Sequence, residues 1–162
     1  MAKVPMTEDK YDYKTFFDKG FDAISNVLSG KGSDFPPFVA QMSEFAMAHQ
    51  GINARKFFAD PEIFVEGNLR ASAELGFDVP DMIWDVYDIE CEATGGKMSW
   101  FDELSPAINN TTPLISTEKD LAKLKAPDPY KDGRMPFVRD VLHLIHEKTG
   151  RQPTIRFCGQ LT

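Results

Sequence analysis

The chain has 162 residues, of which 42% are hydrophobic and 27% charged, a composition typical of globular proteins and not of disordered or collagen-like chains. Its net charge of −7, with 18 lysines and arginines scattered along the sequence, argues against binding to nucleic acid. No apolar run reaches the length of a membrane span, and residues 1–14 are too charged for a signal peptide. We therefore expect a cytoplasmic protein whose partners include neither nucleic acid nor membrane.

The first predicted element is a helix within residues 7–29. Apolar residues recur there at intervals of four, three and four, the period of one helix face: Phe17, Phe21, Ile24 and Leu28. A Gly-Lys-Gly sequence then interrupts the pattern. We interpret residues 1–34 as a helical N-terminal lead-in and residues 35–162 as a second unit.

Three short apolar runs in the second unit are predicted to form strands: residues 38–42, 80–84 and 154–158. The first run is entered through two prolines, which suit the start of a strand, while Pro80 lacks a donor for strand pairing. Helices are predicted between the runs, and strands that alternate with helices indicate a parallel sheet.

The helices between these strands carry local start and stop signals. Asp60 and Pro61 begin one that Gly76 ends, because Asp caps free amides and Gly accepts the left-handed conformation. A short helix over residues 89–94 precedes an irregular excursion with a hairpin near residues 97–101, and Ser116 or Thr117 caps another short helix. A longer helix follows and ends at Gly150.

Three strands cannot close a (β/α)8 barrel, which takes eight units and about 250 residues. We therefore expect either a fragment of a larger protein or a chain that completes its sheet with other polypeptide.

Four segments carry a resemblance to a known family: FFADPEIF, ELGFDVPDMIWDVYDIECEATGGKM, PLISTEKDLAKLKAPDPYKDGRMPFV and the terminal FCGQLT. In this order and spacing they resemble the uroporphyrinogen decarboxylase superfamily. Within it they are similar to the corrinoid-dependent methyltransferases, which include methylcobamide:coenzyme M methyltransferases and O-demethylase components. The resemblance implies the N-terminal portion of a TIM (β/α)8 barrel.

An active site at the carboxyl ends of the strands is implied by the same resemblance. Asp85 is the candidate catalytic residue, although an Asp at this point fits equally well as a helix cap. Candidate substrate-binding residues follow the three predicted strands: Gln41, Met42, Glu44, Trp84, Tyr87, Glu90, Gly159 and Gln160. For Tyr87 and Glu90 a solvated helix face is an alternative, and for Met42 and Trp84 an ordinary place in the core.

The choice of branch depends on residues 42–47. The decarboxylase branch carries an arginine-rich segment there, which suits an octa-anionic tetrapyrrole because guanidinium groups bind carboxylates bidentately. This chain has Glu44 instead, and its first arginine is Arg55. The sequence thus favours a methyltransferase, with a carboxy-lyase and a non-catalytic half-barrel interaction protein as alternatives.

The methyltransferase branch implies several partners for this chain. They are a corrinoid protein that carries the cofactor, a small methylated substrate or thiol acceptor, and the remainder of the barrel or a second chain. Zinc is expected only from a C-terminal part of the barrel, because this sequence lacks the branch's His-x-Cys motif. His143 and His146 share a helix face, but we interpret them as surface residues, and Cys91 and Cys158 as free buried thiols.

Overall fold

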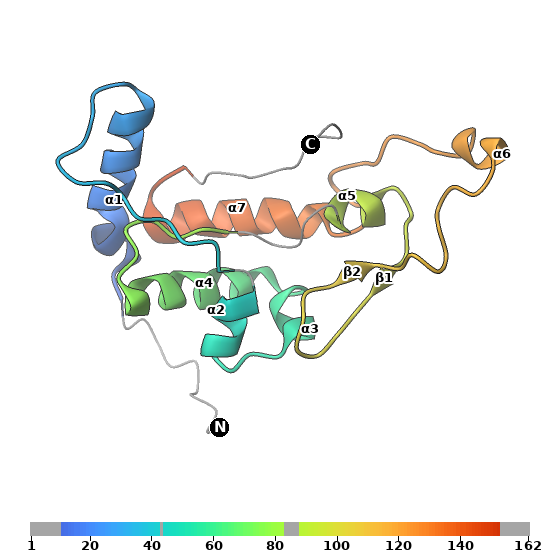
Figure 1. Cartoon of the computed structure of the whole chain (residues 1–162), viewed down its shortest axis with the longest axis horizontal. Coiled ribbons are helices and arrows are strands. Elements are labelled where there is room, and N and C mark those ends of the chain that lie inside the picture. Colours follow the sequence, from blue (N-terminus) through green and yellow to red (C-terminus); the bar gives the residue numbers. More distant parts are fainter. Residues whose placement is uncertain (1–10, 43, 83–87, 153–162) are drawn as a thin grey trace.

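The computed structural model describes residues 11–42, 44–82 and 88–152 (Figure 1). The larger helices are α1 (Tyr13–Leu28), α4 (Pro61–Leu75) and α7 (Met135–Thr149). Shorter elements complete this part of the chain: α2 (Glu44–His49), α3 (Ala54–Phe57), α5 (Asp88–Ala93), β1 (Met98–Ser99), β2 (Ala107–Ile108) and α6 (Glu118–Leu121).

The core of the molecule lies between the helices α4 and α7, which run side by side (Figure 1). Helix α1 crosses one end of this pair, and α2 and α3 pack against α4. The side chains at the centre are almost wholly removed from solvent: Phe17, Phe57, Phe58, Phe64, Leu69, Val141 and Ile145. Burial of each such side chain contributes about 1.5–3 kcal/mol, so this apolar cluster is the main stabilising feature of the described chain.

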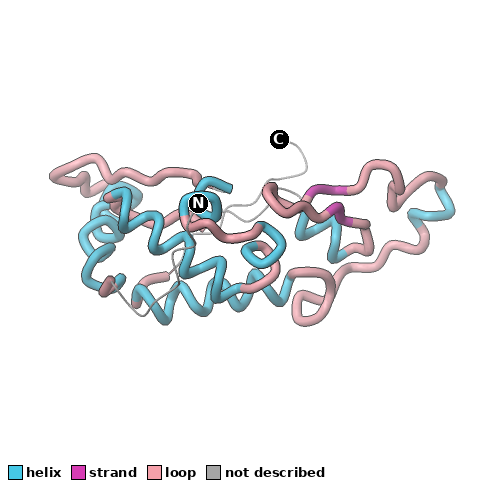
Figure 2. Tube along the Cα trace, turned by 90° about the horizontal axis from the view of Figure 1, so that it is seen from below, coloured by secondary structure: helices cyan, strands magenta, loops and turns pink. Residues whose placement is uncertain are grey.

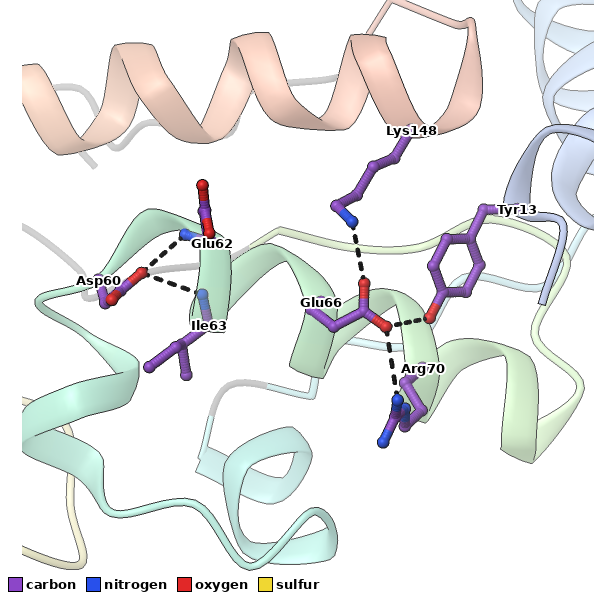
Figure 3. A network of polar contacts seen from close by, with 7 residues as sticks. All are labelled: Tyr13, Asp60, Glu62, Ile63, Glu66, Arg70 and Lys148. Atoms are coloured by element: carbon purple, nitrogen blue, oxygen red, sulfur yellow. Dashed lines mark hydrogen bonds and ion pairs between the residues drawn. The ribbon is translucent and has the colours of Figure 1, made fainter. Parts of the chain in front are cut away.

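Local capping signals in the sequence correctly predicted the ends of α4 and α7. The Asp60 carboxylate accepts hydrogen bonds from the backbone amides of Glu62 and Ile63, at 3.0 and 3.1 Å (Figure 3). At the other end Gly76 adopts a left-handed conformation with φ 72°. Gly150 ends α7 in the same way, with φ 69°, because glycine has no Cβ to clash there.

The lead-in helix α1 is joined to this core by a partly buried carboxylate. Glu66 on α4 accepts a hydrogen bond from the Tyr13 hydroxyl at 2.7 Å and from the Lys148 ammonium at 3.1 Å (Figure 3). Arg70 approaches the same carboxylate at 3.7 Å. Three helices therefore share one acidic group, which fixes the start of α1 against α4 and α7.

A second contact brings α1 close to the backbone that follows α4. A Cβ at Gly20 would lie 1.8 Å from the carbonyl oxygen of Asp78, so only glycine permits this approach. The lead-in is therefore packed tightly onto the unit that follows it.

The parallel sheet expected from the sequence does not form in the described chain. Residues 38–42 and 80–82 are not in strands, so the prediction is wrong for these residues, and residues 83–84 and 154–158 lie outside the described ranges. Phe38 and Asp78 exchange one backbone hydrogen bond, from the Asp78 amide to the Phe38 carbonyl at 3.1 Å, and the Asp78 carboxylate accepts from the Phe38 amide. Paired strands require a continuous series of backbone hydrogen bonds, and this single backbone bond is not enough to form one.

Within the described ranges, strands occur only in a short antiparallel hairpin, and helix is the main regular structure (Figure 2). Met98 pairs with Ile108 and Ser99 with Ala107, which confirms the hairpin expected near residues 97–101. The chain then extends away from the helical body to α6 (Figure 1). Thr117, one of the two caps expected from the sequence, is the N-cap of α6, and it forms a capping box with Asp120.

Candidate functional site

Two insertions carry the described candidates Glu44 and Glu90, while Gln41 and Met42 lie just before the first of them. The first consists of α2 and α3 and follows the segment 38–42; the second consists of α5 and the hairpin and follows the segment 80–84. Both lie between a predicted strand and the next long helix. In a βα barrel such connections lie on the face that carries the active site.

Glu44 links these two insertions. Its carboxylate accepts hydrogen bonds from the Ser105 hydroxyl at 2.6 Å and from the Ser105 amide at 3.3 Å. Glu44 begins α2, while Ser105 lies in the connection between β1 and β2. The residue predicted to bind substrate therefore also holds the hairpin against the first insertion.

A second set of contacts attaches the hairpin to α3. The Arg55 side chain donates to the Asp102 carboxylate at 2.9 Å and to the Trp100 carbonyl at 2.8 Å. The Ala54 amide donates to the Asp102 carbonyl at 2.9 Å. Arg55, the first arginine in the sequence, is therefore engaged by the second insertion.

The other described candidates differ in exposure. Met42 is buried, with 6% of its surface accessible, and its carbonyl accepts from the Phe45 amide at 2.7 Å as the chain turns into α2. Gln41 and Glu90 are exposed to solvent. The remaining candidates lie outside the described residues: Trp84, Asp85, Tyr87, Gly159 and Gln160. Whether the candidate side chains converge on one cavity stays a prediction.

Comparison with protein families decides the broad identity of the chain. The profile of the family described as "Uroporphyrinogen decarboxylase (URO-D)" matches residues 20–160. The chain belongs to this family. Searches of curated proteins and of solved structures returned no significant match. Family membership implies a TIM-barrel-like fold and an enzymatic role, in agreement with the superfamily expected from the sequence.

The family implies a TIM-barrel-like fold, but the only strands of the described residues are the antiparallel pair β1 and β2. The place of the two insertions on the catalytic face of a barrel therefore stays a prediction. No helix in the described part of the chain is long and apolar enough to cross a membrane.

The second insertion carries a cluster of acidic groups around a thiol. Burial raises the pKa of the Cys91 thiol, and the neighbouring carboxylates of Asp88 and Glu92 raise it further. A raised pKa keeps the sulfur protonated near neutral pH, which disfavours its use as a nucleophile or metal ligand. Cys91 is a free thiol, as expected, but it is partly and not wholly buried, and Cys158 lies outside the described ranges.

The two histidines on α7 are on the surface, as predicted. His143 and His146 are both exposed, and His146 lies 3.2 Å from the Arg151 carbonyl. Over residues 11–42, 44–82 and 88–152, no three His, Cys, Asp or Glu side chains are arranged to hold a metal ion.

Sequence reasoning missed the helices α2 and α3 and the partner of Glu44. One signal for α3 was available, because the Asn53 side chain accepts from the Arg55 amide and caps the helix. The pairing of Glu44 with Ser105 spans 61 positions and left no local signal.

Proposed function

We propose that the chain is the N-terminal part of a corrinoid-dependent methyltransferase of the URO-D family, which moves a methyl group between a small methylated substrate or thiol and a corrinoid protein. The observation that carries this proposal is the chemistry of residues 42–47, where the decarboxylase branch has its arginines. Here Glu44 is bonded to Ser105, and the nearest arginine, Arg55, is bonded to the hairpin.

The lack of arginines disfavours a tetrapyrrole with eight carboxylates as the substrate. Each charge-assisted hydrogen bond contributes about 1.5–3 kcal/mol, so each missing guanidinium weakens binding by roughly 10- to 150-fold. An added carboxylate at position 44 opposes an anionic substrate further. A neutral methyl donor or a thiol needs no such cations.

Each candidate residue has a role in this proposal. Asp85 orients the substrate at the strand end, and Met42 supplies apolar surface. Glu44 keeps the two insertions together, while Gln41 and Glu90 offer polar contacts at the rim. The corrinoid, held by a partner protein, supplies the cobalt that carries the methyl group. We propose no zinc ligand among the described residues, and we place the complete enzyme in the cytoplasm.

A carboxy-lyase activity is the second candidate, favoured by the description of the matching family itself. Such an enzyme would act without the corrinoid, through protonation and electrostatic control around Asp85. It requires cations for the substrate carboxylates from elsewhere in the complete barrel.

The two functions are distinguished by parallel assays on the full-length polypeptide that contains this chain. One assay supplies methylcobalamin with 2-mercaptoethanesulfonate and follows the visible absorbance of the cobalamin. The other supplies uroporphyrinogen and follows the fluorescence of the oxidised porphyrin product. Methyl transfer without decarboxylation supports the proposal, and the reverse result assigns the chain to the decarboxylases.

A paired substitution tests the role of Asp85 in the active assay. Asp85→Asn keeps the size of the side chain and removes its charge, so turnover should fall by about 100-fold or more with little change in melting temperature. His143→Ala, on the exposed face of α7, is the control and should leave both unchanged. Full turnover in Asp85→Asn would contradict a catalytic role and favour the alternative that Asp85 is a helix cap.

A further inference from the structure

Arg134, at the start of α7, joins three segments that are far apart in the sequence. Its side chain is 9% exposed, and its Nε atom lies 2.6 Å from the Glu92 carboxylate on α5. Its guanidinium carbon lies 4.9 Å from the centre of the Trp100 ring, next to β1. An ion pair and a cation–π contact therefore meet at one buried side chain.

The backbone before Arg134 is fitted to the same contact. Gly133 has φ 52°, and a Cβ at this position would lie 2.7 Å from the Ala93 amide nitrogen and 2.9 Å from the Glu92 carbonyl carbon. Only glycine allows the chain to pass this close to the end of α5. The approach of α7 to α5 is thus determined by both the backbone and the side chain.

Trp100 extends this connection to the first insertion. Its ring faces Arg134 from α7, while its carbonyl accepts from Arg55 next to α3 at 2.8 Å. The two arginine contacts differ in strength. The Arg55–Asp102 pair is exposed, with side-chain exposures of 55% and 70%, and exposed pairs contribute little. The contact of Arg134 with Glu92, with side-chain exposures of 9% and 22%, is better shielded from solvent and is therefore the stronger of the two arginine contacts.

We infer that Arg134 is a positioning residue that fixes α5 and the β1–β2 hairpin to helix α7. Its relation to catalysis rests on the proposed function. Helix α5 carries Glu90 and begins three residues after Asp85 in the sequence. Arg134 acts on the site through these segments. A displacement of about 1 Å in a catalytic group is enough to reduce the rate by about 100-fold.

Hydrogen exchange of the full-length protein tests the structural part of this inference without an activity assay. In Arg134→Met the amides of residues 88–112 should exchange at least about tenfold faster, with the α4 amides unchanged. Arg134→Lys keeps the charge and should give a smaller increase. Arg139→Met is the matched control, because Arg139 lies on the same helix and faces the Tyr130 ring at 4.6 Å but is exposed.

Steady-state kinetics on the same variants test the catalytic part. Arg134→Lys should lower kcat by about tenfold or more while KM stays within about twofold. Unchanged exchange in residues 88–112 of both Arg134 variants, or equally faster exchange in α4, would overturn the inference. Faster exchange with unchanged kcat would overturn the catalytic part. An inactive wild-type enzyme with the expected exchange pattern would reject the proposed function and leave the positioning of α5 in place.

Discussion

Replacement of Tyr13 by Phe removes one hydroxyl from the contact that attaches α1 to the core. The hydroxyl donates to Glu66 at 2.7 Å, and the Glu66 side chain is only 14% exposed. Hydrogen bonds to charged groups contribute about 1.5–3 kcal/mol, and Glu66 keeps its contact with Lys148 in the variant. We therefore expect a loss near the lower end, about 1.5–2 kcal/mol, which lowers the melting temperature by about 3–8 °C.

Thermal unfolding followed by circular dichroism at pH 7 measures this loss. Tyr130→Phe is the control, because Tyr130 is 71% exposed and keeps its ring contact with Arg139 in the variant. A loss of 1 kcal/mol lowers the melting temperature by about 2–4 °C in a chain of this size. A Tyr13→Phe protein that melts within 1 °C of the wild type would therefore refute the stabilising role of the Glu66 contact.

The same contact predicts a dependence on alkaline pH. Burial raises the pKa of Tyr13 well above its usual value, and the hydrogen bond and charge of Glu66 raise it further. In the unfolded chain the phenol ionises near pH 10, so above this pH the unfolded state loses a proton that the folded state retains. Wild-type stability should therefore fall above about pH 10, by up to about 1.4 kcal/mol per pH unit, and this contribution should be absent in Tyr13→Phe.

Three further outcomes follow from other contacts. Gly20→Ala should lower the free energy of unfolding in urea by at least about 3 kcal/mol, because its Cβ would overlap the Asp78 carbonyl. The control Gly30→Ala should lower it by only about 1 kcal/mol through backbone strain, and equal losses in the two variants would refute the close approach of α1 to Asp78. Ser105→Ala should speed proteolysis within residues 97–112 about tenfold through loss of the Glu44 contact, and unchanged cleavage would contradict that anchor. The hydrogen bonds of Lys123 and Thr117 lower the pKa of Asp120 to about 2, so the cap of α6 should persist at pH 4 and be lost as pH falls through 2, which amide NMR shifts would detect; loss already at pH 4 would contradict it.

Helices were the part of this fold that the sequence predicted well. The ends of α4 and α7 depend on groups within a few positions of each other, such as Asp60 with the next amides and Gly76 after the last turn. The lead-in helix α1 was predicted from the spacing of its apolar residues, which is also a signal between positions close in the sequence. The helices α2 and α3 have six and four residues, too few to show a period.

Strands and site contacts depend on partners that are distant in the sequence. The segment 38–42 forms one backbone hydrogen bond with Asp78. Its apolar composition predicted a strand, because composition alone does not show whether a segment has a partner for continuous backbone pairing. Glu44 was identified as a candidate from its place after a predicted strand. Its hydrogen bond with Ser105 joins residues 61 positions apart, and the ion pair of Glu92 with Arg134 joins residues 42 positions apart. No sequence period applies over such distances.

Transfer of a labelled methyl group is the most direct test of the central claim. The full-length enzyme that contains this chain is mixed with one equivalent of ¹³C-methylcobalamin and excess 2-mercaptoethanesulfonate, and the carbon signal is followed by NMR. The account predicts that the signal moves from its position on cobalt to that of an S-methyl thioether, at a rate reduced by about 100-fold in Asp85→Asn. A label that remains on cobalt, while the same enzyme releases carbon dioxide from uroporphyrinogen, would contradict the account.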